Sequence, residues 1–504
     1  MQINNLKIVH NFTHKVLLEN FNLNVNKGDK IAIIGEEGNG KSSLLKAIYF
    51  EQVDYATITG TIKTSKRLGY LPQQISKEWL RNSVEEFFLK DNLEDEFNYE
   101  RFNDFSIILR KFAEIGLDIS FDRKLSTLSG GELIKIQIVK TLMNDSEILL
   151  LDEPTNDLDL STINWMETYI KNLEIPVLFI SHDETLLENT ANVIIHIEQL
   201  KKKNESKHIV KKIDYKTYLN MRAAKIEHQE QMAYSERRDH KKQMDKFRHV
   251  YARVEHEQNV ISRGDPSGAR LLAKKMKALK SQEKRFDEKE FTDIPIVEEA
   301  IYIEFNDGCF IPNKRVVVDL SLPSLSVGEK KLSKNINLSI VGNEKIVIIG
   351  KNGVGKSTLL KKIISDMEER SLKVGYFPQN YSDIVDFKMT AIQWLKQQTK
   401  IEESIIRSHM GSVRFTREEM GKKIEDYSGG QIAKLCLLRL ILLGSNVLVL
   451  DEPTRNFSPL SNPVFRKALI DYPGCIIAVS HDRKFISEVA SKVYELTNIS
   501  LNKM

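Results

Sequence analysis

The chain has 504 residues, of which 41% are hydrophobic and 29% charged, and its length favours two to four domains over one. Three cysteines without paired spacing exclude a disulfide framework and a multi-cysteine zinc site, and fit a reducing, cytoplasmic compartment. The net charge is only +4, no run approaches the ~18 apolar residues of a membrane span, and the start lacks the layout of a signal peptide.

The first predicted element is a buried strand, IAIIG, at 31–35, followed by G-x-x-x-x-G-K-S and an apolar helical run. This is the context that a phosphate-binding loop requires. Its glycines let backbone N–H groups converge on phosphates at a helix N-terminus, Lys41 reaches the β- and γ-phosphates, and Ser42 ligates Mg²⁺. The predicted ATP ligands of this loop are Gly35, Glu36, Glu37, Gly38, Asn39, Gly40, Lys41, Ser42 and Ser43.

Further polar residues follow other predicted strands of the first half. The apolar run ILLLD delivers Asp152 at its tip, which suits Mg²⁺ binding, and the adjacent Glu153 is placed to activate water as a general base. His182 ends another apolar strand, where it could contact the γ-phosphate. Gln73, in GYLPQ, could sense Mg²⁺ or water. The segment LSGGE (128–132) contributes Ser129, Gly130 and Gly131 before a helical run.

Residues 201–290 carry 25 Lys and Arg against 14 Asp and Glu, a net of +11, so the rest of the chain is net −7. Apolar stripes at 244–254 and 272–279 predict a helical hairpin with a break near 260–268. Such a charge bias indicates contact with a polyanion, although a solvated helical spacer remains an alternative. The predicted RNA-binding residues, at or beside a tip at 256–268, are His256, Asn259, Arg263, Arg270, Lys274, Lys275 and Lys277.

The second half repeats the motifs of the first in the same order. The loop IVIIGKNGVGKST, then GYFPQ, YSGGQ, VLVLDEPT and AVSHD recur, which predicts two similar domains at 1–200 and 296–504 around a linker at 201–295. Asp451, Glu452 and His481 take the metal, base and γ-phosphate roles. The predicted ATP ligands of the second half are Gly350, Lys351, Asn352, Gly353, Val354, Gly355, Lys356, Ser357, Thr358, Gln379, Ser428, Gly429 and Gly430, and its Mg²⁺ ligands are Ser357, Gln379 and Asp451.

Each half thus carries a second anion site, SGG, beside its own phosphate loop, which is useful if it meets ATP held by the other half. In this set of motifs the chain resembles the ATP-binding cassette superfamily, whose cassettes close head-to-tail over two ATP. The resemblance implies an α/β fold with two tandem P-loop domains joined by a helical hairpin, and Mg²⁺-dependent ATP hydrolysis. It pairs Lys41 with Ser428 and Gly430, and Lys356 with Ser129 and Gly131.

Three departures from the family pattern predict that the two sites turn over unequally. The resemblance assigns adenine stacking to Phe12 in the first half, whereas the aligned residue of the second is Val327. Ser458 replaces the Asp that the first half keeps at Asp159. Tyr427 replaces the signature leucine, Leu128.

Two cassettes, no membrane span and a basic hairpin between them resemble the ABC-F translation factors. The resemblance implies a monomer at the ribosomal E site, whose linker contacts large-subunit rRNA and the P-site tRNA of the 70S particle. DEPTRNFSPLS (451–461) is similar to the branch that protects the peptidyl-transferase centre from antibiotics. A housekeeping factor of the same family remains the nearest alternative. A transporter's ATPase subunit is another, but it has no need of the hairpin.

Overall fold

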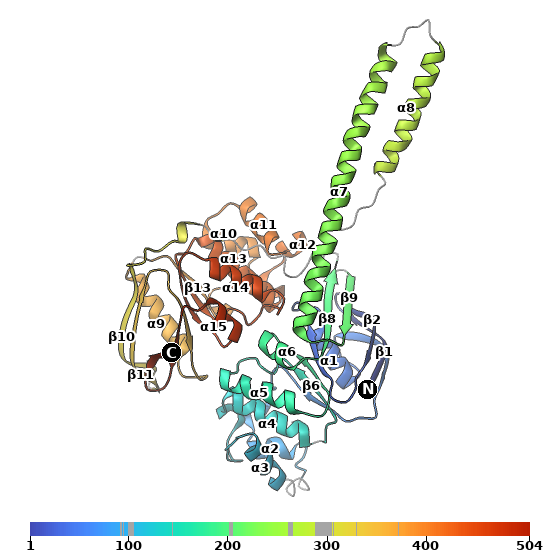
Figure 1. The fold of residues 1–504 in the computed structure, drawn as a ribbon. Coiled ribbons are helices and arrows are strands. Elements are labelled where there is room, and N and C mark those ends of the chain that lie inside the picture. Colours follow the sequence, from blue (N-terminus) through green and yellow to red (C-terminus); the bar gives the residue numbers. More distant parts are fainter. Residues whose placement is uncertain are drawn as a thin grey trace. The chain divides into compact units, whose positions relative to one another are not determined.

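The computed structural model describes residues 1–90, 93, 95–98, 105–143, 145–200, 205–260, 266–287, 305, 307–328, 330–370 and 372–504. They form two compact units. One joins Met1–Tyr215 with Glu298–Met504 and holds both halves of the repeat, and the other is Lys216–Val297 (Figure 1). None of the described helices is both long enough and apolar enough to cross a membrane.

The first cassette is built on a six-stranded sheet in the order β5-β6-β7-β3-β8-β9, parallel except for the edge strand β9. A three-stranded antiparallel sheet, β2-β1-β4, accompanies it. The strands are β1 Gln2–His10, β2 Val16–Asn24, β3 Lys30–Ile34, β4 Ala56–Lys63, β5 Leu68–Leu71, β6 Ile148–Asp152, β7 Val177–Ile180, β8 Val193–Leu200 and β9 Glu205–Lys211. The α-helices are α1 Lys41–Phe50, α2 Val84–Leu89, α3 Phe105–Glu114, α4 Gly130–Met143, α5 Leu160–Asn172 and α6 Glu184–Thr190.

The second cassette repeats this plan in a sheet of order β13-β14-β15-β12-β16-β17, again with one antiparallel edge strand. Its strands are β10 Val316–Val327, β11 Lys330–Val341, β12 Lys345–Ile349, β13 Val374–Phe377, β14 Val447–Asp451, β15 Cys475–Val479, β16 Lys492–Leu496 and β17 Leu501–Lys503. Its α-helices are α9 Lys356–Glu368, α10 Ala391–Thr399, α11 Glu403–Ser412, α12 Arg417–Met420, α13 Gly429–Leu443, α14 Asn462–Asp471 and α15 Arg483–Val489. The predicted α/β fold with two P-loop domains is confirmed.

Strand order brings the sequence motifs together. The central strands KIAII, ILLLD and VLFI of the first cassette are buried along their whole length, as expected of parallel strands covered on both faces. They are β3, β6 and β7, and they are neighbours in the order β6-β7-β3. The phosphate loop follows β3, Asp152 ends β6 and His182 follows β7. Because each motif follows the carboxyl end of a parallel strand, the three motifs share one edge of the sheet. Ligands of open α/β sheets bind at this edge. In the second cassette β14, β15 and β12 repeat this arrangement.

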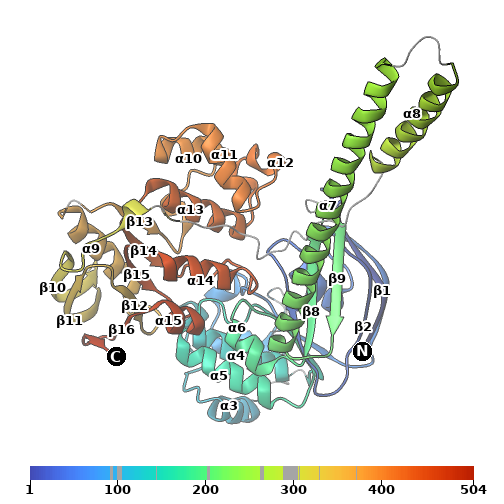
Figure 2. The ribbon, with the colours of Figure 1, turned by 45° about the horizontal axis from the view of Figure 1, so that its top comes forward.

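The remaining unit is the predicted helical hairpin. Helices α7 (Tyr215–Val260) and α8 (Pro266–Asp287) run side by side in both ribbon views (Figure 2). The predicted stripes meet in a seam of Phe247, Val254, Leu272 and Leu279, with Tyr251, Met276 and Phe286 packed against it. The turn itself, 261–265 with Arg263, lies outside the described residues.

Candidate functional site

The phosphate loops wrap around their own lysines. In the first cassette Lys41 Nζ donates to the carbonyl oxygens of Gly35 at 2.8 Å and Glu36 at 3.0 Å. Lys356 Nζ donates to Gly350 O at 2.8 Å in the second. Gly35 has φ +142°, and a Cβ there would lie 2.3 Å from the Ile197 carbonyl oxygen, so only glycine fits. Each loop therefore presents a buried ammonium group at a helix N-terminus, the environment that phosphates require.

Of the residues predicted to hold Mg²⁺, a serine and an aspartate lie together in each cassette. The Ser42 hydroxyl donates to Asp152 Oδ1 at 2.9 Å, and Tyr70 OH lies 3.4 Å from the other carboxylate oxygen. In the second cassette Ser357 likewise hydrogen-bonds to Asp451. Burial raises the pKa of both carboxyls above the usual value, and a bound cation would favour their charged form. A hydroxyl oxygen touching a carboxylate is the hard oxygen donor set that Mg²⁺ prefers.

Glu153, the general-base candidate of the first cassette, is ionised and is contacted by several polar side chains. His182 Nε2 lies 3.1 Å from Glu153 Oε1, and Gln73 Nε2 donates to Oε2 at 2.8 Å. Burial favours the neutral acid, but the charge and hydrogen bond of His182 and the charge of Lys41 hold the pKa of Glu153 at about 2. The other ring nitrogen of His182, Nδ1, faces the carbonyl oxygen of Phe457 in the second cassette at 2.7 Å.

The second cassette places the same residues in a different electrostatic state. His481 Nε2 lies 3.8 Å from Glu452 Oε1, and neither ring nitrogen nor that oxygen has a hydrogen-bond partner in the described part of the chain. Burial raises the pKa of Glu452 to about 8. Burial, reinforced by the charge of Lys356, lowers the pKa of His481 to about 4. Buried polar atoms without partners indicate a place where a polar ligand belongs.

A cavity of about 440 Å³ opens beside these unpaired atoms. From the second cassette it is lined by Lys356, Ser357, Thr358, Gln379, Asp451, Glu452 and His481 among others, and from the first by residues that include Asn156, Asp157 and His182. Leu332 lies on this lining, whereas Val327 does not and is 56% exposed. Phe12, in the turn between β1 and β2, is 82% exposed, which leaves its ring accessible to a base.

The structure brings one of the two predicted cross-cassette arrangements into direct contact. The Gly430 N–H, in the first turn of α13, donates to the Glu37 carboxylate, and Lys434 lies 3.0 Å from Glu36. The phosphate loop of the first cassette thus meets the signature of the second. At the other site Asn352 and Arg455 contact Asp157 of the first cassette, the latter at 2.7 Å. The signature residues 129–131 are not on the cavity lining.

The residues predicted to bind RNA, where described, lie on the exposed surface of the hairpin unit. His256 and Asn259 are on α7, and Arg270, Lys274, Lys275 and Lys277 are on α8.

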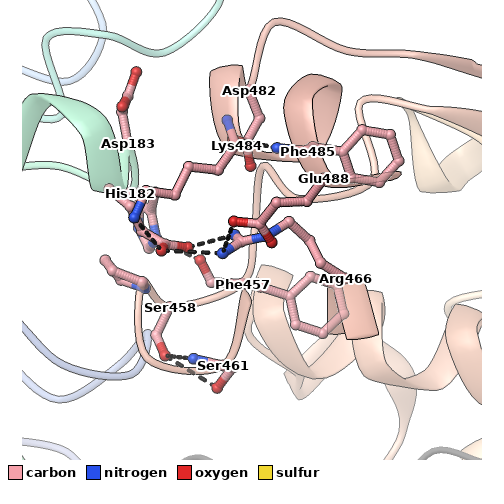
Figure 3. A network of polar contacts seen from close by, with 12 residues as sticks. His182, Asp183, Phe457, Ser458, Ser461, Arg466, Asp482, Lys484, Phe485 and Glu488 are labelled. Carbon is pink, nitrogen blue, oxygen red and sulfur yellow. Dashed lines mark hydrogen bonds and ion pairs between the residues drawn. The ribbon is translucent and has the colours of Figure 1, made fainter. Parts of the chain in front are cut away.

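Sequence reasoning missed a charged network that joins the two cassettes (Figure 3). Arg466 of α14 contacts Glu184 of the first cassette at 2.5 Å and Glu488 of its own at 2.7 Å. Arg483 pairs with Asp183 at 3.2 Å and with Glu167. The available signal was the repeat itself, because positions 167 and 184 are acidic where their equivalents, 466 and 483, are basic.

Comparisons with known proteins agree with this geometry. The family model described as "ABC transporter" matches residues 18–156 and 333–455, together just over half of the chain. "ATP-binding protein Uup" of Buchnera aphidicola is 30% identical over 504 residues, covering 96% of this chain and 79% of that protein. "ABC transporter F family member 5" of Arabidopsis thaliana is 28% identical, covering 95% and 72%. Among solved structures, the archaeal ribosome recycling factor aABCE1 in complex with stalk protein aP1 shares the fold, with a TM-score of 0.61 at 15% identity, covering 99% of this chain and 90% of that one.

Proposed function

This chain belongs to the ABC-F family, whose paired cassettes bind and hydrolyse ATP, and we propose that it uses that cycle to act on the ribosome. In this proposal it works in the cytoplasm as a monomer and docks at the E site of the 70S ribosome. The linker then points toward P-site tRNA, large-subunit rRNA and the peptidyl-transferase centre. Binding there protects the ribosome from antibiotics that target that centre.

The chemistry assigned to the cassettes follows from their own side chains. Lys41 and Lys356 bind the phosphates, and Glu153 is already ionised to accept a proton from the attacking water. His182 orients Glu153 through the 3.1 Å contact. Ser42 with Asp152, and Ser357 with Asp451, would hold Mg²⁺, which neutralises charge that develops on the phosphates. Because Glu452 favours its neutral form, the second site is the slower one unless ligand binding changes its environment.

One observation carries the ribosomal proposal. An apolar seam packs the two helices of the hairpin together, so the basic residues on the outside of the helices are not needed for that packing. Phe247, Val254, Leu272 and Leu279 are each at most 9% exposed. Lys274, Lys275 and Lys277 remain exposed on the same unit. Rigid helices that display cations suit the phosphate backbone of RNA, where affinity depends on neutralising phosphates. A passive spacer would not need this charge.

The two-cassette fold is shared with an archaeal ribosome recycling factor, although its identity of 15% bears on the fold alone. The antibiotic part of the proposal depends on the motif at 451–461, in which Arg455 replaces the asparagine of the first cassette.

Ribosome binding is tested with the double variant Glu153→Gln, Glu452→Gln, which removes the general base but keeps the shape of each site. With excess ATP, we expect this variant to sediment with 70S particles, because the ATP-bound form persists. Lys41→Ala with Lys356→Ala, which cannot hold the phosphates, serves as the control and should remain in the supernatant. Sedimentation of the double glutamine variant free of ribosomes would contradict the proposal.

Antibiotic protection is tested separately from ribosome binding. Expression in a sensitive bacterium should raise the inhibitory concentrations of peptidyl-transferase drugs, and the double glutamine variant should not confer this protection. Ribosome binding without any change in susceptibility would instead favour the housekeeping translation factor.

A further inference from the structure

Two ion pairs between the cassettes are equivalent by the internal repeat, yet their charges are reversed. Glu167 of α5 and Arg466 of α14 stand at equivalent positions, as do Glu184 of α6 and Arg483 of α15, both 299 residues apart. Arg466 pairs with Glu184, and Arg483 pairs with Glu167. Both carboxylates therefore belong to the first cassette and both guanidinium groups to the second.

The Arg466–Glu184 pair is the more deeply buried of the two. The side chains are 2% and 4% exposed, and two parallel hydrogen bonds join them, at 2.5 Å and 3.2 Å. Burial alone would disfavour the charge on Arg466, but the bonds and charges of Glu184 and Glu488 hold its pKa above the usual value. A buried bidentate pair of this kind is strongly directional. Removing one member destabilises the protein, because it leaves the other charge buried without a partner.

Further ion pairs cross the same interface, while Asp482, the equivalent of Asp183, and Glu488 are acidic residues on the side of the second cassette. Asp183 accepts from Arg483 at 3.2 Å, and Lys484 lies 3.6 Å from Glu184 and also contacts Glu188. We call the two surfaces the acidic face and the basic face. The acidic face of the first cassette is Glu167, Asp183, Glu184 and Glu188, and the basic face of the second is Arg466, Arg483 and Lys484. Figure 3 shows Lys484, Arg466 and Glu488 gathered beside Asp183 and His182.

We propose that these faces specify how the cassettes pair: the acidic face accepts only a second cassette, and the contact holds the two cassettes of one chain together. A first cassette meeting another first cassette would place Glu167 opposite Glu184 twice. Two second cassettes would place Arg466 opposite Arg483. Like charges brought together in a poorly solvated interface are strongly unfavourable, so only the unlike pairing forms.

The acidic and basic faces lie next to a histidine of the predicted ATP site. His182 is adjacent to Asp183, and its ring contacts Phe457 of the second cassette, so the charged faces adjoin the catalytic histidine. The inference deepens the intramolecular pairing on which the proposed function rests, but it involves no ribosome, so a failure of ribosome binding leaves it intact.

The test reverses the charges one face at a time in the full chain. One variant carries Glu167→Arg with Glu184→Arg, another carries Arg466→Glu with Arg483→Glu, and a third combines all four changes. Fluorescence energy transfer between dyes on Lys27→Cys and Ile499→Cys, without nucleotide, reports whether the cassettes are together. Both label positions are exposed, whereas Cys309, Cys436 and Cys475 are buried and escape labelling.

We expect each one-sided variant to lose about tenfold or more of its high-transfer population, and the fourfold variant to regain it. Mixing the two one-sided variants should produce an intermolecular complex in sedimentation velocity, because one is basic on both cassettes and the other acidic. Unchanged transfer in the one-sided variants, or a fourfold variant no better than they are, would overturn the proposal.

A folding defect in the one-sided variants does not end the test. Glu167→Gln with Arg483→Gln removes the more exposed pair, at 17% and 20%, without reversing a charge. We expect a partial loss of the high-transfer population in that neutral variant, and no loss would count against the proposal. Recovery of folding in the fourfold variant alone would support it, since only complementarity is restored there.

Discussion

The carboxylate of Glu37, in the phosphate loop of the first cassette, accepts a hydrogen bond from the N–H of Gly430 in the second. Gly430 lies in the first turn of α13, where unsatisfied N–H groups and the helix dipole favour an anion. The protein's own carboxylate thus lies against the part of the signature that the γ-phosphate is expected to reach. At the equivalent position the second cassette has a neutral side chain, Asn352.

Glu37→Asn should therefore strengthen ATP binding at the first site. It removes a competing anion and a negative charge that faces the triphosphate, and we expect affinity to rise about three- to tenfold. The measurement is a titration with a fluorescent ATP analogue in a Lys356→Ala background, which silences the second site. As the matched control, Asn352→Glu in a Lys41→Ala background should weaken binding. Weaker binding by Glu37→Asn would instead make the carboxylate a ligand of the nucleotide.

Glu153→Gln and Glu452→Gln should change the thermal stability of the nucleotide-free protein in opposite directions at pH 7. The folded pKa of Glu153, about 2, lies below the ordinary 4.5, so its charged form contributes stability above pH 4.5 that is lost as pH falls toward 2. The folded pKa of Glu452, about 8, lies above 4.5, so its effect reverses and stability falls as pH rises from 4.5 to 8. Glutamine removes both effects.

We accordingly expect the melting temperature to fall for Glu153→Gln and to rise for Glu452→Gln at pH 7. At pH 4 the Glu452→Gln difference should have nearly vanished, whereas most of the Glu153→Gln difference should remain, because it is lost only toward pH 2. Scanning calorimetry at the two pH values measures this. Shifts of the same sign in both variants would show that the two sites have similar electrostatics.

Asp159→Ala should destabilise the first cassette by about 1 kcal/mol at pH 7, the usual cost of losing an N-cap. Asp159 Oδ1 accepts from Thr162 N at 3.0 Å and from Ser161 Oγ at 2.8 Å at the start of α5. Burial opposes its charge, but these bonds keep the pKa of Asp159 below the ordinary 3.8. Its contribution is therefore complete above about pH 4 and is lost as pH falls through the folded pKa.

The matched control for that variant is Ser458→Ala in the second cassette. The Ser458 hydroxyl accepts from Ser461 N at 3.2 Å and carries no charge, so the cost of its removal should not depend on acid. Denaturant unfolding of both variants between pH 3 and pH 7 makes the comparison. An equal pH dependence in the two would contradict the assignment.

Phe247→Ala should loosen the hairpin by about 3 kcal/mol, because it deletes a ring from the centre of the seam. Phe247 is 6% exposed and also contacts Phe286, with ring centroids 5.6 Å apart. Hydrogen exchange should accelerate in α7 and α8 while the cassettes keep their protection. Val250→Ala, on the same helix but 50% exposed, is the control and should change little. Unaltered exchange in Phe247→Ala would mean that the seam does not hold the helices.

The position of each phosphate loop, between a buried strand and a helix, could be predicted from the sequence because the motif is local. The loop from Gly35 to Ser42 is contiguous, and the strand order that joins it to Asp152 and His182 is a regular property of parallel sheets. The hairpin was likewise readable, since the stripe from Phe247 to Val254 is periodic.

The contacts that could not be predicted from the sequence join segments that are far apart in the chain. Glu37 meeting Gly430, and Arg466 meeting Glu184, each join residues more than 280 positions apart and carry no local signature. The contrast between Glu153 and Glu452 was equally hidden, because it arises from how deeply each carboxyl is buried and from how closely the neighbouring histidine approaches, 3.1 Å against 3.8 Å. Burial and partner geometry decide such protonation states, and identical motifs do not encode them.

The reversed charges at 167, 184, 466 and 483 also bear on the history of a duplicated gene. An ancestor with identical halves could have worked as two separate copies of a single half. Once one half had become acidic and the other basic at these positions, neither could be deleted, exchanged or replaced by its sister without opposing like charges.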